Sequence, residues 1–360
     1  MCRNYIGNGA VSRRRKAMAV AADEIQKEEE EEPISCGKKK KKKKKSEYAL
    51  KSFEELPEYM KDNEFILRYY RVDWPFKESL LSLFRWHNET LNVWTHLIGF
   101  LVFVGLTVVN SIDAPPQLAD FITIFTGHLE SNMNSSRKRD FVSEHLKLAD
   151  INHQSSPPAT NWPFYVFLSG AMFCLLTSST CHLFFCHSKK LSLHLLQLDY
   201  VGITVMIITS FFPPIFYIFL CSPHWQLLYL LGITLIGICT VLTLLTPSFS
   251  AGKYRSFRAL LFVSMGLFGL VPAVHALVAN WDDPHRDVTL AYESAMAGFY
   301  LTGAAVYVGR IPERWRPGWF DIAGHSHQIF HVFVVMGALA HYGATQVFLR
   351  FRSRMVCVAS

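Results

Sequence analysis

The distribution of charged residues constrains this chain more than any other feature. No Asp, Glu, Lys or Arg occurs in residues 200–252, 259–281 or 322–349, although 18% of all residues are charged. A helix of about 20 mainly apolar residues crosses the hydrocarbon core of a bilayer, and each of these stretches is long enough to do so. A soluble domain would not keep such long stretches free of charge. The sequence therefore predicts a multi-pass membrane protein.

The alternation of apolar runs and polar connections predicts an all-α membrane protein, a bundle of seven transmembrane helices. The second, fourth and sixth connections hold clusters of Lys and Arg, whereas the short third and fifth connections hold only Arg286. Because basic residues remain on the cytoplasmic side, the N-terminus is expected in the cytoplasm and the C-terminus outside. The expected spans are about 92–111, 163–186, 197–220, 225–246, 258–280, 289–308 and 322–348.

Composition divides the chain into four expected parts. Residues 1–46 form a charged N-terminal tail that is expected to be disordered, and residues 47–90 form a cytoplasmic juxtamembrane region with an amphipathic helix. Residues 91–349 form the seven-helix domain, which includes a long outside loop at 112–162. Residues 350–360 form a C-terminal tail. Any membrane-embedded site must therefore come from the third part.

The N-terminal tail is expected to meet partners at the membrane surface. Its run Lys38–Lys45 suits anionic lipids of the inner leaflet, and the tail as a whole suits unidentified signalling proteins. Nucleic acid is not an expected partner, because the basic residues are not arranged on a folded, aromatic-bearing surface. The eight cysteines contain no CxxC pair, so no disulfide framework or thiolate zinc site is expected, and Cys221 should pack as a small apolar side chain.

Four polar side chains fall at one depth of the expected bundle, near its cytoplasmic surface. They are His182 at the end of the second span, Asp199 at the start of the third, and His327 and His331 at the start of the seventh. Residues four apart share a helix face, as in the HxxxH pairs of zinc enzymes. Three neutral imidazoles leave a fourth coordination position for water, which is typical of catalytic zinc sites. The sequence therefore predicts a Zn²⁺ site.

Two further residues complete the expected site. Asp199 would accept a proton from the water or hold it in line, and Ser178, one turn before His182, would orient that imidazole or bind a substrate oxygen. A lone histidine in a membrane helix is more often a hydrogen-bonded core residue. That interpretation applies to His96, His275 and His341.

Other classes of seven-helix protein lack their signatures in this chain. A retinal protein needs a Schiff-base lysine in its last helix, and no Lys follows Lys253. A G-protein-coupled receptor usually carries DRY after its third span and NPxxY in its seventh, and neither motif is present. Transport is not favoured, because the spans show no clear repeat and few helix breaks beyond Pro213–Pro214 and Pro272.

Six segments resemble the progestin and adipoQ receptor family, most of all its adiponectin-receptor and plant heptahelical branch. The resemblance covers about residues 56–348 and includes the family pattern Ser-x3-His, Asp, His-x3-His, which begins here at Ser178. By resemblance, the three histidines bind zinc and Asp199 contacts the zinc-bound water. The first outside loop is longer than in the animal receptors, so their ligand surface is not carried over. The segments are LPEYMKDNEFILRYYR (56–71), FRWHNETLNVWTHLIGF (84–100), SSTCHLFFCHS (178–188), LDYVGI (198–203), RIPERWRPGWFDIAGHSHQIFHV (310–332) and HY (341–342).

The resemblance implies two alternative functions. In the first, the protein is a zinc-dependent hydrolase that cleaves a ceramide-like lipid amide at the cytoplasmic leaflet, with the lipid or a free fatty acid held in the bundle. In the second, it is a receptor or scaffold in which zinc only joins three helices. Plant members of the family are linked to hormone, sugar and abiotic-stress responses, so a signalling role is expected in both cases. The expected location is the plasma membrane or an endomembrane.

Overall fold

The computed structural model describes residues 48–112, 161–250, 252–281 and 283–352. Within these ranges all the long regular elements are helices, and the β contact they contain is an isolated bridge in the segment before the first span. The run Lys38–Lys45, most of the loop expected at 112–162 and most of the tail expected at 350–360 lie outside the described residues.

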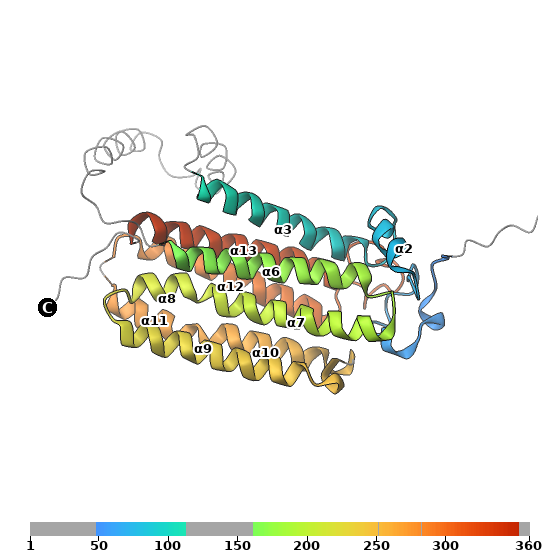
Figure 1. The fold of residues 1–360 in the computed structure, drawn as a ribbon. Helices are drawn as coiled ribbons and strands as arrows, with labels where there is room; N and C mark the ends of the chain where they lie inside the picture. Colours follow the sequence, from blue (N-terminus) through green and yellow to red (C-terminus); the bar gives the residue numbers. More distant parts are fainter. Residues whose placement is uncertain (1–47, 113–160, 251, 282, 353–360) are drawn as a thin grey trace, which may run out of the picture. The chain divides into compact units, whose positions relative to one another are not determined.

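Seven membrane-crossing helical spans lie side by side in the part of the chain that begins at residue 48 (Figure 1). Six stretches among the described residues are both long and apolar enough to span a bilayer. The remaining span, α12, is as long but carries Arg286, Asp287 and Glu293. The expected seven-helix bundle is confirmed. Its spans are α3 (Thr90–Ser111), α6 (Trp162–Phe184), α7 (Lys189–Ser210) continued by α8 (Phe212–Ile218), α9 (Pro223–Leu244), α10 (Arg255–Phe268) continued by α11 (Leu270–Ala279), α12 (Arg286–Gly309) and α13 (Ser326–Phe351).

The third span begins earlier than expected, at Lys189 rather than near residue 197. The Ser188 hydroxyl accepts a hydrogen bond from the Leu191 N–H and so caps the first turn of α7. Lysines in that turn reach the membrane surface through their long aliphatic stems, so the helix need not begin where the apolar run begins. Asp199 consequently lies about three turns inside α7 and not at its start.

The seventh span begins later than expected, at Ser326 rather than near residue 322. The Glu313 carboxylate accepts hydrogen bonds from both the N–H and the hydroxyl of Ser326. This cap satisfies one of the N–H groups that the first turn of a helix leaves without an intrahelical partner. His327 therefore lies in the first turn of α13, at the end of the bundle where α6 ends.

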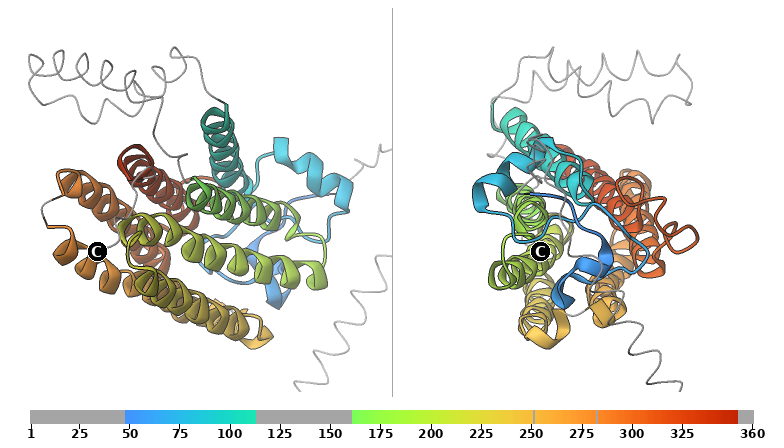
Figure 2. Two further views of the ribbon diagram at one scale, coloured as in Figure 1. Left: turned by 60° about the vertical axis from the view of Figure 1, so that its left-hand side comes forward. Right: turned by 90° about the vertical axis from the view of Figure 1, so that its right-hand side faces the viewer.

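Helices α3, α6 and α13 share one apolar core. Its fully buried side chains include Phe103 of α3, Phe167 and Leu175 of α6, and Ala338 of α13. Figure 2 shows α3 running beside α6 and α13 when the bundle is turned about its vertical axis. Burial of these side chains keeps the three helices that carry most of the site's residues in register.

The segment before the first span is attached to the end of α6 by one buried arginine. The Arg71 guanidinium donates hydrogen bonds to the carbonyls of His182 and Leu183, at 2.8 and 2.9 Å, and to the Ser82 hydroxyl. These two carbonyls belong to the last turn of α6, where no further helical N–H is available to them. Arg71 thus fixes the backbone that carries His182.

Helix α2 (Phe76–Leu81) leaves much of its apolar surface exposed, although Phe76 also stacks on Phe184 of α6. Phe76 and Leu80 are 55% and 48% exposed, whereas the small polar side chains of Ser79 and Ser82 are buried. A helix on the surface of a soluble protein shows the reverse arrangement. The exposed apolar face suits the boundary between headgroups and acyl chains, as the amphipathic pattern of this segment predicts.

Cys221, which follows α8, forms a disulfide bond, so the expectation that it packs as a free apolar side chain is wrong. Cys174, Cys181 and Cys186 are free and buried, as expected. Sequence spacing could not identify the bonded residue, because cysteines distant in the chain come together only through the fold.

The close approach of α6 and α7 depends on Gly202. A Cβ atom at this position would lie 2.4 Å from Thr177 Oγ1 and 3.2 Å from the Cα of Cys174. The Thr177 hydroxyl already donates to backbone carbonyls of its own helix, so it cannot turn aside freely. The two helices would have to separate to admit a methyl group.

We therefore expect Gly202→Ala to destabilise the purified protein by about 1–3 kcal/mol, the usual effect of overpacking. Thermal unfolding in detergent measures the change. Gly105→Ala is the matched control, because a Cβ there meets nothing within 4 Å and the intrinsic gain in helix propensity is the same. Equal melting temperatures for the two variants would contradict this account of the packing.

Candidate metal centre

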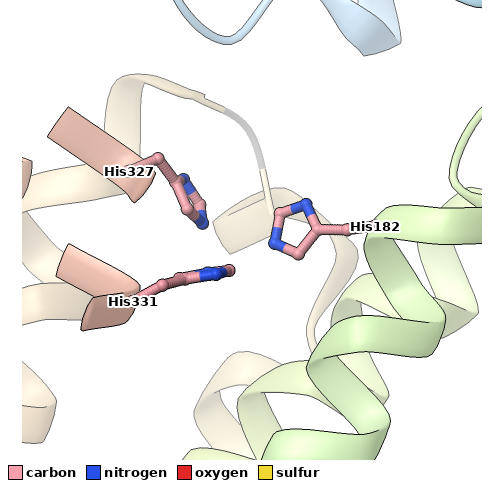
Figure 3. Close-up of side chains that lie close together, drawn as sticks. All are labelled: His182, His327 and His331. Carbon is pink, nitrogen blue, oxygen red and sulfur yellow. The ribbon is translucent and has the colours of Figure 1, made fainter. Parts of the chain in front are cut away.

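Three histidines from two helices converge at one end of the bundle (Figure 3). His182 projects from the last turns of α6, and His327 and His331 project from one face of α13. One ring nitrogen of each lies within 4.8 Å of the corresponding nitrogens of the other two. The ring centroids are 4.7–4.9 Å apart. This spacing allows all three nitrogens to bind one ion.

Two of the rings are oriented by hydrogen bonds from their outward nitrogens. His182 Nδ1 lies 2.7 Å from a carboxylate oxygen of Glu89, and His331 Nδ1 lies 3.2 Å from the Asn92 carbonyl and from Thr95 Oγ1. The other nitrogen of His182, Nε2, is buried and has no hydrogen-bond partner. A buried nitrogen without a partner is costly in a protein interior unless a ligand satisfies it.

The donor set fits a zinc ion. Neutral imidazoles are good zinc ligands, and metal-binding histidines usually donate their second N–H to a carboxylate or a carbonyl, as His182 and His331 can here. Three ligands leave one coordination position open. The three histidines could therefore hold one metal ion, and the sequence-predicted ligands His182, His327 and His331 are the residues that come together.

Glu89 belongs to this site, although sequence reasoning did not identify it. Burial by itself raises the pKa of its carboxyl, but the charge and hydrogen bond of His182 and the hydrogen bond from Asn92 outweigh burial, so its pKa lies well below the usual range. An ionised Glu89 holds the proton of His182 on Nδ1 and leaves Nε2 free. One sign of this role was present in the sequence, because Glu89 is an acidic residue directly before an apolar span. The expected start of that span at residue 92 placed Glu89 outside the bundle.

Asp199 and Ser178 lie beside the histidines in the same cavity. One carboxylate oxygen of Asp199 is buried without a hydrogen-bond partner, and the side chain forms a hydrogen bond with Ser178. Ser178 is therefore placed to hold the Asp199 carboxylate, and its expected roles, orienting the His182 ring or binding a substrate oxygen, stay predictions.

The cavity has a volume of about 760 Å³, within the range of small-molecule sites. It extends from the histidines along apolar side chains of α7, α10 and α12, among them Ile203, Val263 and Leu301. Its lining also includes two basic residues, Lys253 just before α10 and Arg255 at the start of α10. The cavity thus combines a long apolar part with a polar end.

The three histidines expected to be bonded core residues have different surroundings. His275 Nδ1 lies 2.8 Å from the Tyr229 hydroxyl, as expected, and His341 lies 3.0 Å from the Glu293 carboxylate. The expectation is wrong for His96: its ring stacks on His331 at 3.6 Å, and both of its nitrogens are buried without partners. The His331 ring is thereby packed on a face as well as hydrogen-bonded at its edge.

Comparison with known proteins agrees with the geometry. Residues 84–342 match the model of a family described as "Haemolysin-III related". The chain is 57% identical over 308 residues to "Heptahelical transmembrane protein 1" of Arabidopsis thaliana, with 86% of this chain and 83% of the relative covered. It is 53% identical over 333 residues to "Heptahelical transmembrane protein ADIPOR1" of Oryza sativa subsp. japonica (87% and 88% covered). It is 33% identical over 292 residues to the "Adiponectin receptor protein" of Drosophila melanogaster (81% and 57% covered). The resemblance seen in the sequence is confirmed.

The turn that carries Glu89 is held by a neutral histidine, His87. Its Nδ1 accepts a hydrogen bond from the Glu89 N–H, and its Nε2 lies 3.2 Å from the Ser82 carbonyl. Only the neutral ring, protonated on Nε2, satisfies both contacts. Burial, with the nearby Arg71 guanidinium, accordingly lowers the pKa of His87 to about 3.

This lowered pKa predicts a dependence of stability on pH. The unfolded chain binds the His87 proton with a pKa near 6.5, so the unfolded state gains protons first and stability falls as pH falls from about 6.5 towards 3. We expect the melting temperature in detergent to fall less between pH 7.5 and pH 5.5 in His87→Gln than in the wild type. Parallel pH profiles would show that His87 makes no such contribution.

Proposed function

We propose that this chain, a heptahelical, adiponectin-receptor-like membrane protein that belongs to the haemolysin-III related family, binds one zinc ion and uses it to hydrolyse a lipid amide. The observation that carries the proposal is the geometry of the three histidines. Their nitrogens lie within 4.8 Å of one another, and the inward nitrogen of His182 is buried without a partner.

The side chains around the centre suit hydrolysis. A zinc ion supplies a Lewis acid that polarises a carbonyl and makes water a stronger nucleophile at neutral pH. Asp199 would accept the proton of the attacking water through its unpartnered oxygen, with Ser178 holding the other part of the carboxylate in place. Glu89 would keep His182 in the tautomer that binds metal.

The shape of the cavity supports a lipid as substrate. Its apolar part between α7, α10 and α12 suits an acyl chain, which places the carbonyl of a ceramide-like amide, or the carboxylate of a free fatty acid, near the histidines. Helix α2 contacts this end of α6 through Phe76 and leaves its other apolar side chains exposed, so the bilayer would be adjacent to the site.

We also propose that this end of the bundle faces the cytoplasm. Disulfides form in oxidising compartments and not in the cytoplasm. The bonded Cys221 follows α8, at the other end of the spans from the histidines, which supports a cytoplasmic position for the histidines. With the N-terminus inside, Lys38–Lys45 would reach anionic lipids and the N-terminal tail would be available to signalling proteins. A role in hormone, sugar or stress signalling at the plasma membrane or an endomembrane is part of this proposal.

The alternative function is a receptor or scaffold in which zinc has only a structural role. A specific observation favours it: Glu89 joins the start of α3 to His182 of α6, and the zinc ligands join α6 to α13. A metal here would therefore connect three helices whether or not it takes part in chemistry. The two alternatives differ in what they require of Asp199.

The first prediction concerns the metal itself. Elemental mass spectrometry on the protein purified without chelators should find about one zinc per chain. His327→Ala should lose the metal, and Glu89→Gln should bind it about 10–100-fold more weakly, because the hydrogen bond that orients His182 is weakened. A folded wild type without zinc would refute both the hydrolase and the structural-zinc alternatives.

The second prediction separates the alternatives. Asp199→Asn should keep zinc and fold but lower amide hydrolysis by about 10²–10⁴-fold, the usual contribution of a positioned general base. The assay follows fatty-acid release from a ceramide in detergent or nanodiscs. Zinc content and melting temperature are the controls. Absence of hydrolysis from the zinc-loaded wild type would favour the structural role, and hydrolysis that persists in Asp199→Asn would refute Asp199 as the general base.

A further inference from the structure

We propose that the connection between α12 and α13, residues 310–325, binds anionic phospholipids of the adjacent membrane leaflet through a Trp–Arg patch. The patch is separate from the metal centre, and the proposal needs neither zinc nor hydrolysis. Its occupant is a lipid headgroup that carries a net negative charge, held within the bilayer. The patch consists of Arg314, Trp315, Arg316 and Trp319.

The patch presents two large aromatic rings to the surroundings of the protein. Trp315 and Trp319 are 71% and 73% exposed, whereas Trp74 of the juxtamembrane segment is 3% exposed. Leu67 adds to this apolar surface, because it is 39% exposed and its Cδ1 lies 3.2 Å from the position of a Cβ at Gly318. Apolar side chains that are exposed together mark a surface that binds a membrane or another molecule.

The two arginines of the patch have no acidic partner in the described parts of the chain. Arg314 and Arg316 are exposed, and neither forms an ion pair with a described residue. Arg310, four residues earlier, does form one, with Glu64. Residues 314–319 contain no Asp or Glu. The guanidinium groups of the patch are therefore available to phosphate, which arginine binds through two parallel N–H groups.

A tight turn brings one arginine and one tryptophan of the patch together. The Trp319 N–H donates to the Arg316 carbonyl at 3.2 Å, and Pro317 and Gly318 (φ +81°) lie at the centre of the turn, as in a type II turn. The Arg316 guanidinium lies 4.6 Å from the centroid of the Trp319 ring. This contact holds the guanidinium beside the ring and leaves N–H groups at its edge for an anion.

The connection is attached firmly to the rest of the protein although its tryptophans are exposed. The Gly318 N–H donates to the Phe65 carbonyl at 3.0 Å. The Glu313 carboxylate accepts a hydrogen bond from Asn63 Nδ2 at 3.1 Å and two more from Ser326. Because these contacts order the backbone before a ligand binds, little conformational entropy is lost when a lipid occupies the patch.

The position of the connection favours a lipid over a soluble protein. It follows the end of α12 at Gly309 and precedes the start of α13 at Ser326, so it begins and ends where two spans leave the hydrocarbon. In the end-on view of Figure 2, it projects sideways beyond the helices, on the side opposite to α2. A surface that projects sideways at this level lies over headgroups. Tryptophan is enriched at that boundary, and arginine is attracted to its anionic lipids.

The test measures which lipids surround the two rings. The full chain is placed in phosphatidylcholine nanodiscs that contain equal fractions of either brominated phosphatidylserine or brominated phosphatidylcholine, whose bromines quench nearby tryptophan fluorescence. The signal of the patch is the emission of the wild type minus that of Trp315→Phe/Trp319→Phe. We expect brominated phosphatidylserine to quench this signal with an apparent affinity about fivefold higher or more, the effect of one arginine near an anionic surface.

Arg314→Gln/Arg316→Gln should lower this preference to within about twofold, because only the charges are removed. Quenching by brominated phosphatidylcholine should remain, since the rings stay at the boundary. Lys189→Gln/Lys190→Gln is the matched control: it removes two exposed positive charges at the same end of the bundle, from α7, and should keep the preference. Unchanged melting temperatures show that the variants keep the fold.

Three results would overturn the proposal. Equal quenching by the two brominated lipids would show that the patch does not select charge. Quenching by neither lipid would show that the rings face water, as a surface for a soluble acidic partner would. A preference that survives Arg314→Gln/Arg316→Gln would assign the selection to other residues. Loss or absence of amide hydrolysis would refute only the proposed function, because these measurements need no turnover.

Discussion

A polar group that is buried between membrane helices must find its hydrogen-bond partner within the protein. Several contacts that satisfy such groups meet at His182. Water is not available in the hydrocarbon core to satisfy backbone or side-chain groups. The carbonyls of His182 and Leu183 accept hydrogen bonds from Arg71, and the Nδ1 of His182 forms a hydrogen bond with the Glu89 carboxylate. One residue thus joins the juxtamembrane segment, α3 and α6. The nitrogen that remains without a partner faces His327 and His331, which leaves the site dependent on a ligand.

The same demand explains why the segment before the first span is folded. Asp62 pairs with Arg255, Glu64 with Arg310, and the Leu67 N–H donates to Asp321 at 2.8 Å. These contacts cover the polar end of the cavity with residues that are far away in sequence. Ion pairs at such a boundary are weakly screened on their buried side, so they help to hold the segment in place.

Much of the fold follows from the order of residues alone. The charge-free stretches define the spans, because no other arrangement removes so many apolar side chains from water, and the i, i+4 spacing places His327 and His331 on one face before any tertiary contact is known. Errors arose where polar residues lie within a helix. The start of α7 was placed too late because Lys189 and Lys190 were assigned to the connection before it, whereas they form its capped first turn. Glu89 was omitted because it precedes the expected first span, which was placed from residue 92.

The sequence by itself determined the class of protein, the number of spans and the set of candidate ligands, since each depends on local composition and helical periodicity. Tertiary structure alone decided which polar groups become partners. That Glu89 orients His182, that Ser178 bonds to Asp199, that His96 stacks on His331 and that Asp62 reaches Arg255 all depend on how helices rotate and approach one another. The packing of side chains, such as those around Gly202, sets these rotations. Such packing joins residues that are distant in the chain, so no periodic pattern in the sequence predicts it.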